Sequence, residues 1–482
     1  MKRPGFILWC VVLSLSFGCE KDSKPSRPNI ILILADDLGW ADLGCYGNMY
    51  HETPHLDRLA GKSLRFTDAY ATCPVCSPTR ASILTGKYPA TLNLTDWIPG
   101  RQNRKGVQPT DVLVPPNFEQ QLNLEEFTLA EALKQQGYVT ANIGKWHLGD
   151  TAHYPTHQGF DLNITGNHYG FPANYFYPYR NHWRKNYTFD DLIKEGQEGE
   201  YLTDRLNEEA IKFIGKNKNK PFFLYLPHYA VHTPLVSKDG LFNYFTGKEQ
   251  KVPESTFTNP RYAGMLKSLD EGVGSILDYL DNEGLTQNTI IIFTSDNGGL
   301  SVQEAKYTPS TSNAPLRQGK GYLGEGGIRV PLIIHWPGAT RPGITEQVVN
   351  SNDLLPTILE GLQISFNEYK IDGKSFLQHL QPGEKLAERS IFWHYPHYSN
   401  QGGKPSGAVR QGDFKLIEYY EDESLELFNL KEDPSESNNL AEQMPGKVKE
   451  LHQLLQTWRD QTNAQMPSPN PMYDPSLVST KK

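Results

Sequence analysis

Cys73-Pro-Val-Cys76-Ser-Pro-Thr-Arg80-Ala-Ser-Ile-Leu-Thr-Gly86 is the stretch around which the rest of the chain is organised. It predicts a turn that leads into a helix, because Pro78 suits a first helical turn, where its missing N–H costs no hydrogen bond. Gly86 can end that helix. Cys76 is then expected at the helix N-terminus, where backbone N–H groups and the macrodipole favour negative charge. Arg80 lies one turn later on the same face, so the stretch suits an anionic substrate.

The Cys73–Cys76 pair has two other interpretations, a thioredoxin-like redox pair and half of a zinc site. The chain contains no second Cys-x-x-Cys, and the Ser-Pro-Thr-Arg that follows has no role in either. We therefore predict a reactive Cys76 and a packed, unreactive thiol at Cys73.

Length and composition indicate a globular α/β protein. The chain has 482 residues, of which 38% are hydrophobic and 11% aromatic, enough for one large domain and a smaller one. The net charge of −8, without any basic run, argues against nucleic acid as a partner.

Residues 1–19 are predicted to be a signal peptide. Lys2 and Arg3 precede an apolar stretch that is too short to span a membrane as a helix. The end of this segment is typical of a lipoprotein, with lipid on Cys19, although the bulky Phe17 departs from that pattern and plain secretion is the alternative. Residues 20–27 are expected to be a tether. We predict export to the bacterial periplasm or a lipid anchor in the cell envelope, with no disulfide framework.

Two apolar runs are predicted to be strands buried on both faces, as in a parallel sheet: Asn29–Ala35 and Thr289–Ser295. Asp36-Asp37 follows the first and Asp296-Asn297 the second. Each pair alone could be an ordinary turn. Two matching strand ends favour one shared oxygen-ligand site, and a hard divalent cation would relieve the repulsion between the carboxylates.

Cys76-Ser-Pro-Thr-Arg80 followed by Ala-Ser-Ile-Leu-Thr-Gly86 resembles the signature of the type I sulfatases, members of the alkaline phosphatase superfamily. The resemblance implies that Cys76 is oxidised to formylglycine (3-oxoalanine) by a formylglycine-generating or anaerobic maturating enzyme. It also implies one calcium ion, bound by Asp36, Asp37, Asp296, Asn297 and the modified Cys76. Oxygen ligands favour calcium over zinc.

Three further motifs resemble the same family. Gly144-Lys145-Trp146-His147-Leu-Gly149 matches the motif whose lysine and histidine face the sulfate, and a spacing of two on an extended segment places both on one face. His232-Thr-Pro234 matches the motif whose histidine contacts the leaving oxygen, with His228 the weaker choice. Residues 315–331 resemble the loop that supplies a sulfate-binding lysine, here Lys320, while Arg317, Glu325 and Arg329 are expected to hold that loop.

The resemblance implies a catalytic role for each of these residues. Arg80, Lys145 and Lys320, with calcium, would neutralise the sulfate oxygens. Residue 76 would be the nucleophile, His232 with Lys320 would protonate the leaving oxygen, and His147 would accept a proton when sulfate departs.

Several other side chains are weaker candidates for sugar contacts. The aromatic segment 167–183 and the loop residues Asp96, Trp97 and Arg101 could contact sugar rings, although an ordinary packed insertion explains the segment equally well. His394 and His397 could border the pocket, but a surface role is the simpler interpretation.

The expected fold is α/β, with a large mixed, mostly parallel sheet sandwiched by helices, as in alkaline phosphatase. Residues 28–372 would form this catalytic domain. Short strands between turn residues, then an amphipathic helix, predict a smaller α+β subdomain on an antiparallel sheet over 373–465, and residues 466–482 a loose tail.

The predicted activity is hydrolysis of sulfate esters on a polysaccharide or its oligosaccharides, such as ulvan, carrageenan or a glycosaminoglycan. A phosphomonoester or phosphonate hydrolase of the same superfamily is one alternative, because phosphate and sulfate have similar shapes. A carbohydrate-binding relic without catalysis is the other, although every expected catalytic position is filled.

Overall fold

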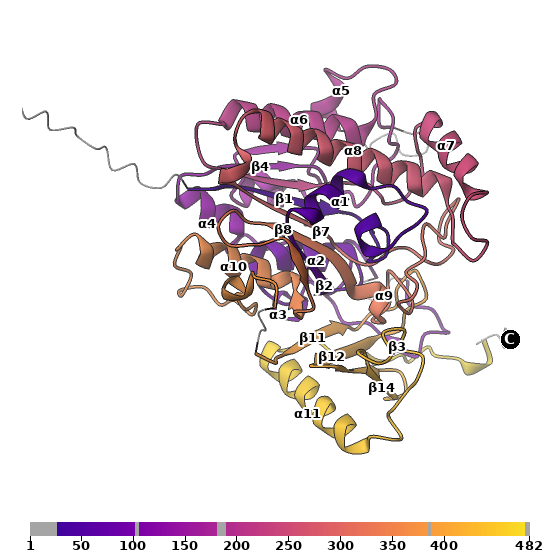
Figure 1. Ribbon diagram of the computed structural model, residues 1–482. Coiled ribbons are helices and arrows are strands. Elements are labelled where there is room, and N and C mark those ends of the chain that lie inside the picture. The colour runs from indigo at the N-terminus through magenta and orange to yellow at the C-terminus, as the bar shows by residue number, and fades with distance from the viewer. Residues whose placement is uncertain (1–26, 102–105, 181–188, 384–386, 478–482) are drawn as a thin grey trace, which may run out of the picture.

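The computed structural model describes residues 27–101, 106–180, 189–383 and 387–477 (Figure 1). The predicted signal peptide, Cys19 and all but the last residue of the tether lie outside these ranges. No helix within them combines the length and the apolar character needed to cross a bilayer.

The described residues form a nine-stranded sheet in the order β10-β2-β8-β7-β1-β6-β4-β5, with β9 paired to β2. Only β8 runs antiparallel to its neighbours, so the predicted mixed, mostly parallel sheet is confirmed. The strands are β1 (Asn29–Ala35), β2 (Leu64–Tyr70), β4 (Val139–Ile143), β5 (Leu162–Ile164), β6 (Phe222–Pro227), β7 (Thr289–Ser295), β8 (Arg329–His335), β9 (Gly343–Thr345) and β10 (Val349–Asn350).

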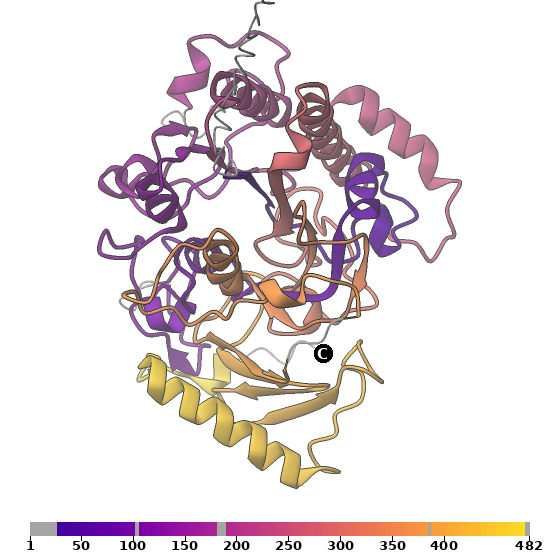
Figure 2. The same ribbon diagram turned by 60° about the vertical axis from the view of Figure 1, so that its left-hand side comes forward.

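Helices cover both faces of this sheet (Figures 1 and 2). Side chains of β1 alternate between two cores: Ile31 and Ile33 pack with one set of helices, Ile30 and Leu32 with the other. The first set is α1 (Pro54–Gly61), α6 (Leu202–Asn217) and α8 (Pro260–Asn282), with α7 (Asp239–Glu249) outside α8; the second is α2 (Cys76–Thr85), α4 (Leu129–Gln135) and α10 (Leu354–Gly361). Three short helices complete the described set: α3 (Pro89–Leu92), α5 (Asp190–Ile193) and α9 (Glu325–Ile328).

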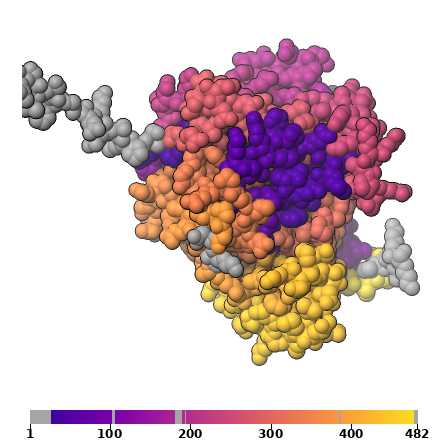
Figure 3. Space-filling view, in the orientation of Figure 1, coloured from indigo at the N-terminus to yellow at the C-terminus, as the bar shows by residue number. Residues whose placement is uncertain are grey.

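A second, four-stranded antiparallel sheet confirms the predicted C-terminal subdomain. Its strands are β11 (Ser390–Tyr395), β12 (Ser406–Gln411), β13 (Phe414–Tyr419) and β14 (Leu425–Asn429). One face packs on α11 (Pro445–Thr462) and the other on residues around Cys73 and Ile328. The subdomain therefore lies directly against the larger domain, as Figure 3 shows in yellow.

Both ends of the subdomain differ from the prediction. Phe376 and Leu380 are buried in the core beneath α10, so the segment after residue 373 still belongs structurally to the large domain. The tail was expected to be loose, yet β15 (Ser468–Pro469) pairs with β3 (Leu113–Val114). The Pro-rich composition of the tail does not indicate this attachment, because the hydrogen-bond partners of the segment lie more than 300 positions earlier in the chain.

Asn470 anchors the tail. Its side-chain amide donates to the carbonyls of Gln108 (3.1 Å) and Asp111 (2.7 Å), and its side chain is nearly buried. We expect Asn470→Ala to weaken this attachment by about 1–2 kcal/mol and to speed proteolytic cleavage within 466–477. Asn438→Ala, at an exposed position, is the control. Equal cleavage rates in the two variants would show that the tail does not depend on this amide.

Candidate active site

The two predicted acidic pairs meet at the carboxyl edge of the sheet. The strands β1 and β7 are parallel neighbours, with Ala35 paired to Ser295, so the residues that follow them are adjacent. Asp37 N–H donates to Asp296 Oδ1 at 3.2 Å, and Asn297 Nδ2 donates to Asp37 Oδ1 at 2.8 Å. All four side chains are buried. Gly298 is required beside them, because a Cβ there would lie 1.8 Å from the carbonyl oxygen of Gly326.

Cys76 is the first residue of α2, as predicted, and Gly86 ends the helix with φ +70°. Its Sγ lies 3.6 Å from Asp36 Oδ1 and 4.0 Å from Asp37 Oδ1. Burial raises the pKa of this thiol well above its usual value, since it outweighs the opposing effect of Lys145. Cys73 is buried in the core between the two domains, in keeping with a packed thiol.

Three buried cations face the carboxylates. Arg80, one turn along α2, donates from Nε to Asp296 Oδ2 at 2.9 Å. Lys145 Nζ lies 2.7 Å from Asp36 Oδ2, and Lys320 Nζ lies 2.7 Å from Asp37 Oδ2. Burial raises the pKa of Asp36 to about 8, and the neighbouring Asp296 adds to that shift, although Lys145 opposes it. Three carboxyl groups and three cations therefore lie in direct contact in the buried site.

His232 joins this group through Lys320. Its Nδ1 lies 2.8 Å from the carbonyl oxygen of Thr233 and donates to it, so Nε2 accepts from Lys320 Nζ at 3.0 Å. His228 was the weaker candidate for the histidine that contacts the leaving oxygen. It is buried without a hydrogen-bond partner for either ring nitrogen, and burial lowers its pKa to about 3.

His147 reaches the site by a different backbone path from the one expected. Its φ of 62° is left-handed, so Lys145 and His147 do not simply alternate along an extended segment. The Nε2–H donates to the carbonyl oxygen of Ile98 at 2.5 Å, whereas Nδ1 is buried and has no partner. Burial, reinforced by Lys145, lowers the pKa of His147 well below its usual value, so the ring is neutral.

A cavity of about 330 Å³ opens above these residues, within the size range of small-molecule sites. Cys76, His147, His232 and Lys320 contribute to its inner part. The remaining lining residues, which we call the outer wall, come from four segments of the large domain and from the C-terminal subdomain: Val75, Trp97, Ile98, Pro99, His168, Tyr169, Gly170, Phe171, Glu304, Asn400 and Gln401.

Sequence reasoning identified part of this outer wall and missed the rest. Trp97 and the stretch 168–171 were expected, and residues 181–183 of the same aromatic segment lie outside the described residues. Glu304, Asn400 and Gln401 were missed, because they belong to no motif and meet only in the folded chain. No pattern in the sequence could have found them.

Other weak candidates have structural roles. Asp96 is buried and accepts from the Tyr395 hydroxyl at 3.0 Å, while Arg101 pairs with Asp111 at 3.6 Å. His394 and His397 are buried rather than at the surface, and neither lines the cavity.

The loop residues expected to be structural all form ion pairs, and those of Arg317 and Glu325 cross to the C-terminal subdomain. Arg317 pairs with Glu426 at 2.9 Å, Arg329 with Asp68 at 2.7 Å, and Glu325 with Lys415 at 2.9 Å.

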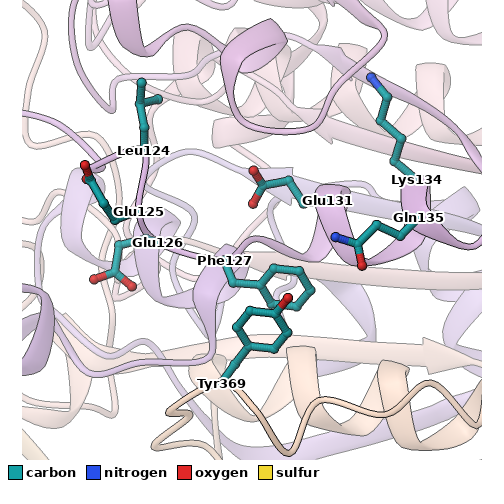
Figure 4. Close-up of a pocket in the computed structure, with 8 residues that line it drawn as sticks. All are labelled: Leu124, Glu125, Glu126, Phe127, Glu131, Lys134, Gln135 and Tyr369. Atoms are coloured by element: carbon teal, nitrogen blue, oxygen red, sulfur yellow. The ribbon is translucent and has the colours of Figure 1, made fainter.

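A second hollow, of about 260 Å³, lies at the start of α4 and contains none of the predicted site residues (Figure 4). Its polar groups have structural roles: Glu131 caps α4 by accepting from the Thr128 N–H at 2.8 Å. The rings of Phe127 and Tyr369 stack 3.5 Å apart. This hollow offers no nucleophile and no cluster of cations, so the chemistry lies in the cavity above Cys76.

The side chains at the sheet edge fit a divalent cation. Asp36, Asp37, Cys76 and His232 each offer a ligand atom within 4.8 Å of the others. In addition, the Oδ1 of Asn297 is buried and has no hydrogen-bond partner. A buried amide oxygen without a partner beside three carboxylates is well explained by an ion that accepts oxygen ligands.

Comparison with known proteins agrees with this site. The sulfatase family profile matches residues 28–364, and the profile of the N-sulphoglucosamine sulphohydrolase C-terminal region matches residues 319–461. A sulfatase of Formosa agariphila is 32% identical, covering 94% of this chain and 92% of the relative. Human arylsulfatase A is also 32% identical, covering 89% and 86%.

Among solved structures, that of Ps i-CgsB in complex with k-i-k-neocarrahexaose is 31% identical to this chain, with a TM-score of 0.72. The match covers 94% of this chain and 96% of that one. The chain is thus similar to sulfatases over nearly its whole described length. With its active-site cysteine, acidic pairs and cations all present, it belongs to the sulfatase family, in the alkaline phosphatase superfamily.

Proposed function

We propose that the protein removes sulfate from sulfated carbohydrates, with residue 76 as the nucleophile after its thiol has been oxidised to formylglycine. The observation that carries the proposal is the position of Cys76 in the inner part of the cavity, beside Asp36 and within the same cavity as Lys320 and His232. A sulfate monoester is an anion with a poor leaving group. Its hydrolysis needs cations for the sulfate oxygens, a nucleophile, and a proton for the departing oxygen.

Calcium is the ion that we assign to the sheet edge, because the donors are hard oxygens. Asp36, Asp37, Asp296 and Asn297 would hold it. When bound, calcium supplies positive charge to the sulfate oxygens and favours ionisation of the nucleophile. Arg80, Lys145 and Lys320 add fixed positive charge around the same point, in a buried setting where such charge acts strongly.

His232 and Lys320 are assigned to the leaving group. Because His232 Nδ1–H donates to the Thr233 carbonyl, the N–H of Lys320 is directed to Nε2. The pair therefore holds a proton in the inner cavity, where it can pass to the departing oxygen. Such general acids contribute about 10²–10⁴-fold to rate.

His147 is assigned to the second half of the reaction. Donation from Nε2–H to Ile98 fixes the tautomer, and Nδ1 is left as a proton acceptor. A neutral imidazole in the cavity can accept a proton from residue 76 as sulfate leaves, which regenerates the site.

The proposed substrate is a sulfated polysaccharide or oligosaccharide, such as ulvan, carrageenan or a glycosaminoglycan. A similar protein binds a carrageenan oligosaccharide, and the aromatic wall of the cavity suits sugar rings. The proposal includes export of the chain to the bacterial envelope, with or without lipid on Cys19, and maturation of Cys76 by a formylglycine-generating or anaerobic maturating enzyme.

The test compares nitrophenyl sulfate with nitrophenyl phosphate, using protein coexpressed with a maturating enzyme. We expect sulfate release to exceed phosphate release by a factor of about 10² or more, because the chain belongs to the sulfatase family and such enzymes bind the transition state of sulfate transfer best. Sulfated polysaccharides should release sulfate in the same preparation. Faster phosphate release would favour a phosphohydrolase instead, and binding of sulfated glycans without any release would favour the non-catalytic alternative.

A further inference from the structure

The cavity has two parts of opposite electrostatic character. Its inner part contains Lys320 and His232. Its outer wall contains Glu304, which is the only carboxylate among the described residues that line the cavity. The arrangement places a fixed negative charge where the sugar, rather than its reacting sulfate, would lie.

Glu304 is held in position by contacts on both sides. Gln401 Nε2 donates to Glu304 Oε2 at 2.8 Å, and the backbone N–H of Glu304 donates to Thr308 Oγ1 at the same distance. Gln401 is itself fixed, since its carbonyl oxygen accepts from the Tyr322 hydroxyl at 2.5 Å. The carboxylate therefore has a defined place at the junction of the large domain and the C-terminal subdomain.

Among the described lining residues no cation forms an ion pair with Glu304, and Lys320 interacts with its charge only beyond ion-pair distance. Lys320 is the only ammonium or guanidinium group among the described lining residues, and it is paired with Asp37 at 2.7 Å. His168 is the one histidine of the outer wall, and its Nδ1 is hydrogen-bonded to the Tyr154 hydroxyl at 2.8 Å. A carboxylate or second sulfate on the sugar would find no unpaired cation among the described lining residues and would be repelled by Glu304.

The same wall suits an uncharged sugar. Trp97 and Phe171 present aromatic surface, and the ring of Phe171 lies parallel to that of His232, 5.8 Å away. Asn400 and Gln401 carry amides that can donate to or accept from hydroxyl groups.

We propose that Glu304 is a specificity-determining residue that restricts the site to a sugar unit with no charge besides the reacting sulfate. A neutral hexose or N-acetylhexosamine unit would be accepted, and a sulfated uronate or a disulfated unit rejected. This inference rests on the proposed function, because it concerns the substrate of the same site.

The experiment uses pairs of monosulfated glycosides, a hexoside and the matching hexuronide, sulfated at the same ring carbon. We measure kcat/KM for sulfate release by the matured full-length enzyme and by Glu304→Gln, which keeps the shape and the contact with Gln401. Wild type should prefer the hexoside. The substitution should raise the hexuronide-to-hexoside ratio by about tenfold, equivalent to about 1.4 kcal/mol.

Glu442→Gln is the matched control, because it removes the same charge from an exposed residue that does not line the cavity. The control should leave the ratio unchanged. The inference is overturned if wild type uses both members equally, or if Glu304→Gln changes their ratio by less than about twofold. Failure of the proposed function looks different: no member of any pair, hexoside or hexuronide, then releases sulfate.

Discussion

Cys76→Ala is expected to lower kcat for sulfate release by a factor of about 10³ or more, in protein coexpressed with the maturating enzyme. The methyl side chain can be neither oxidised to an aldehyde nor attack sulfur. The carboxylates and cations around it remain in place, so substrate binding should persist while turnover is lost. The measurement is the steady-state rate on nitrophenyl sulfate, together with the mass of the peptide that carries residue 76.

Cys73→Ala is the matched control, because it removes the neighbouring thiol of the same Cys-x-x-Cys pair. Cys73 is buried between the domains and does not line the cavity, so this variant should lose some stability but keep its turnover per folded molecule. Equal turnover by the wild type and by Cys76→Ala, or equal loss in both variants, would contradict the assignment of the nucleophile.

The features that could be predicted from the sequence are those that depend on short, local sequence patterns. Continuous runs of branched residues mark β1 and β7 as buried parallel strands, and the residues directly after such strands must meet at one edge of the sheet. Pro78 and Gly86 mark the two ends of the helix that begins with Cys76. Both the sheet and the centre of the site follow from these short-range signals.

The features that could not be predicted depend on contacts between distant segments. Glu304 and Gln401 are nearly 100 positions apart and belong to different subdomains, yet they form one hydrogen bond at the cavity wall. The left-handed backbone of His147 is a local feature that its motif does not indicate. Lys415 follows Phe414 in an alternating strand pattern, where a lysine is normally expected to face solvent.

Lys415 is instead completely buried and joins the two domains. Its Nζ lies 2.9 Å from Glu325 Oε1, on the loop that supplies Lys320, and 3.0 Å from Glu436 Oε1. Burial alone would raise the pKa of Glu325, but Lys415 and Arg329 outweigh it and hold this pKa at about 2. Because that pKa lies below the value in the unfolded chain, the stabilisation is complete above about pH 4.3 and is lost as the pH falls toward 2.

Lys415→Met keeps the length of the side chain and removes its charge, which leaves two buried carboxylates without their shared cation. We expect the free energy of unfolding at neutral pH to fall by about 3–5 kcal/mol. It should recover in part when Glu325→Gln and Glu436→Gln are added, since the uncompensated charges are then gone. Lys431→Met, at an exposed position of the same subdomain, should change stability by no more than about 0.5 kcal/mol.

Denaturant unfolding at neutral pH, and again near pH 3, distinguishes lost charge pairing from lost packing. The four proteins are the wild type, Lys415→Met, the triple variant with Glu325→Gln and Glu436→Gln, and Lys431→Met. If Lys415→Met lowers the free energy of unfolding for electrostatic reasons, this loss must become smaller as the pH falls, because protonation removes the unpaired charge of Glu325. An equal loss of unfolding free energy at both pH values would mean that Lys415 acts through the packing of its alkyl chain. In the electrostatic case the ion pair fixes the loop of Lys320 to the C-terminal subdomain. The position of Lys320 then depends in part on Lys415, a residue that lies outside every active-site motif.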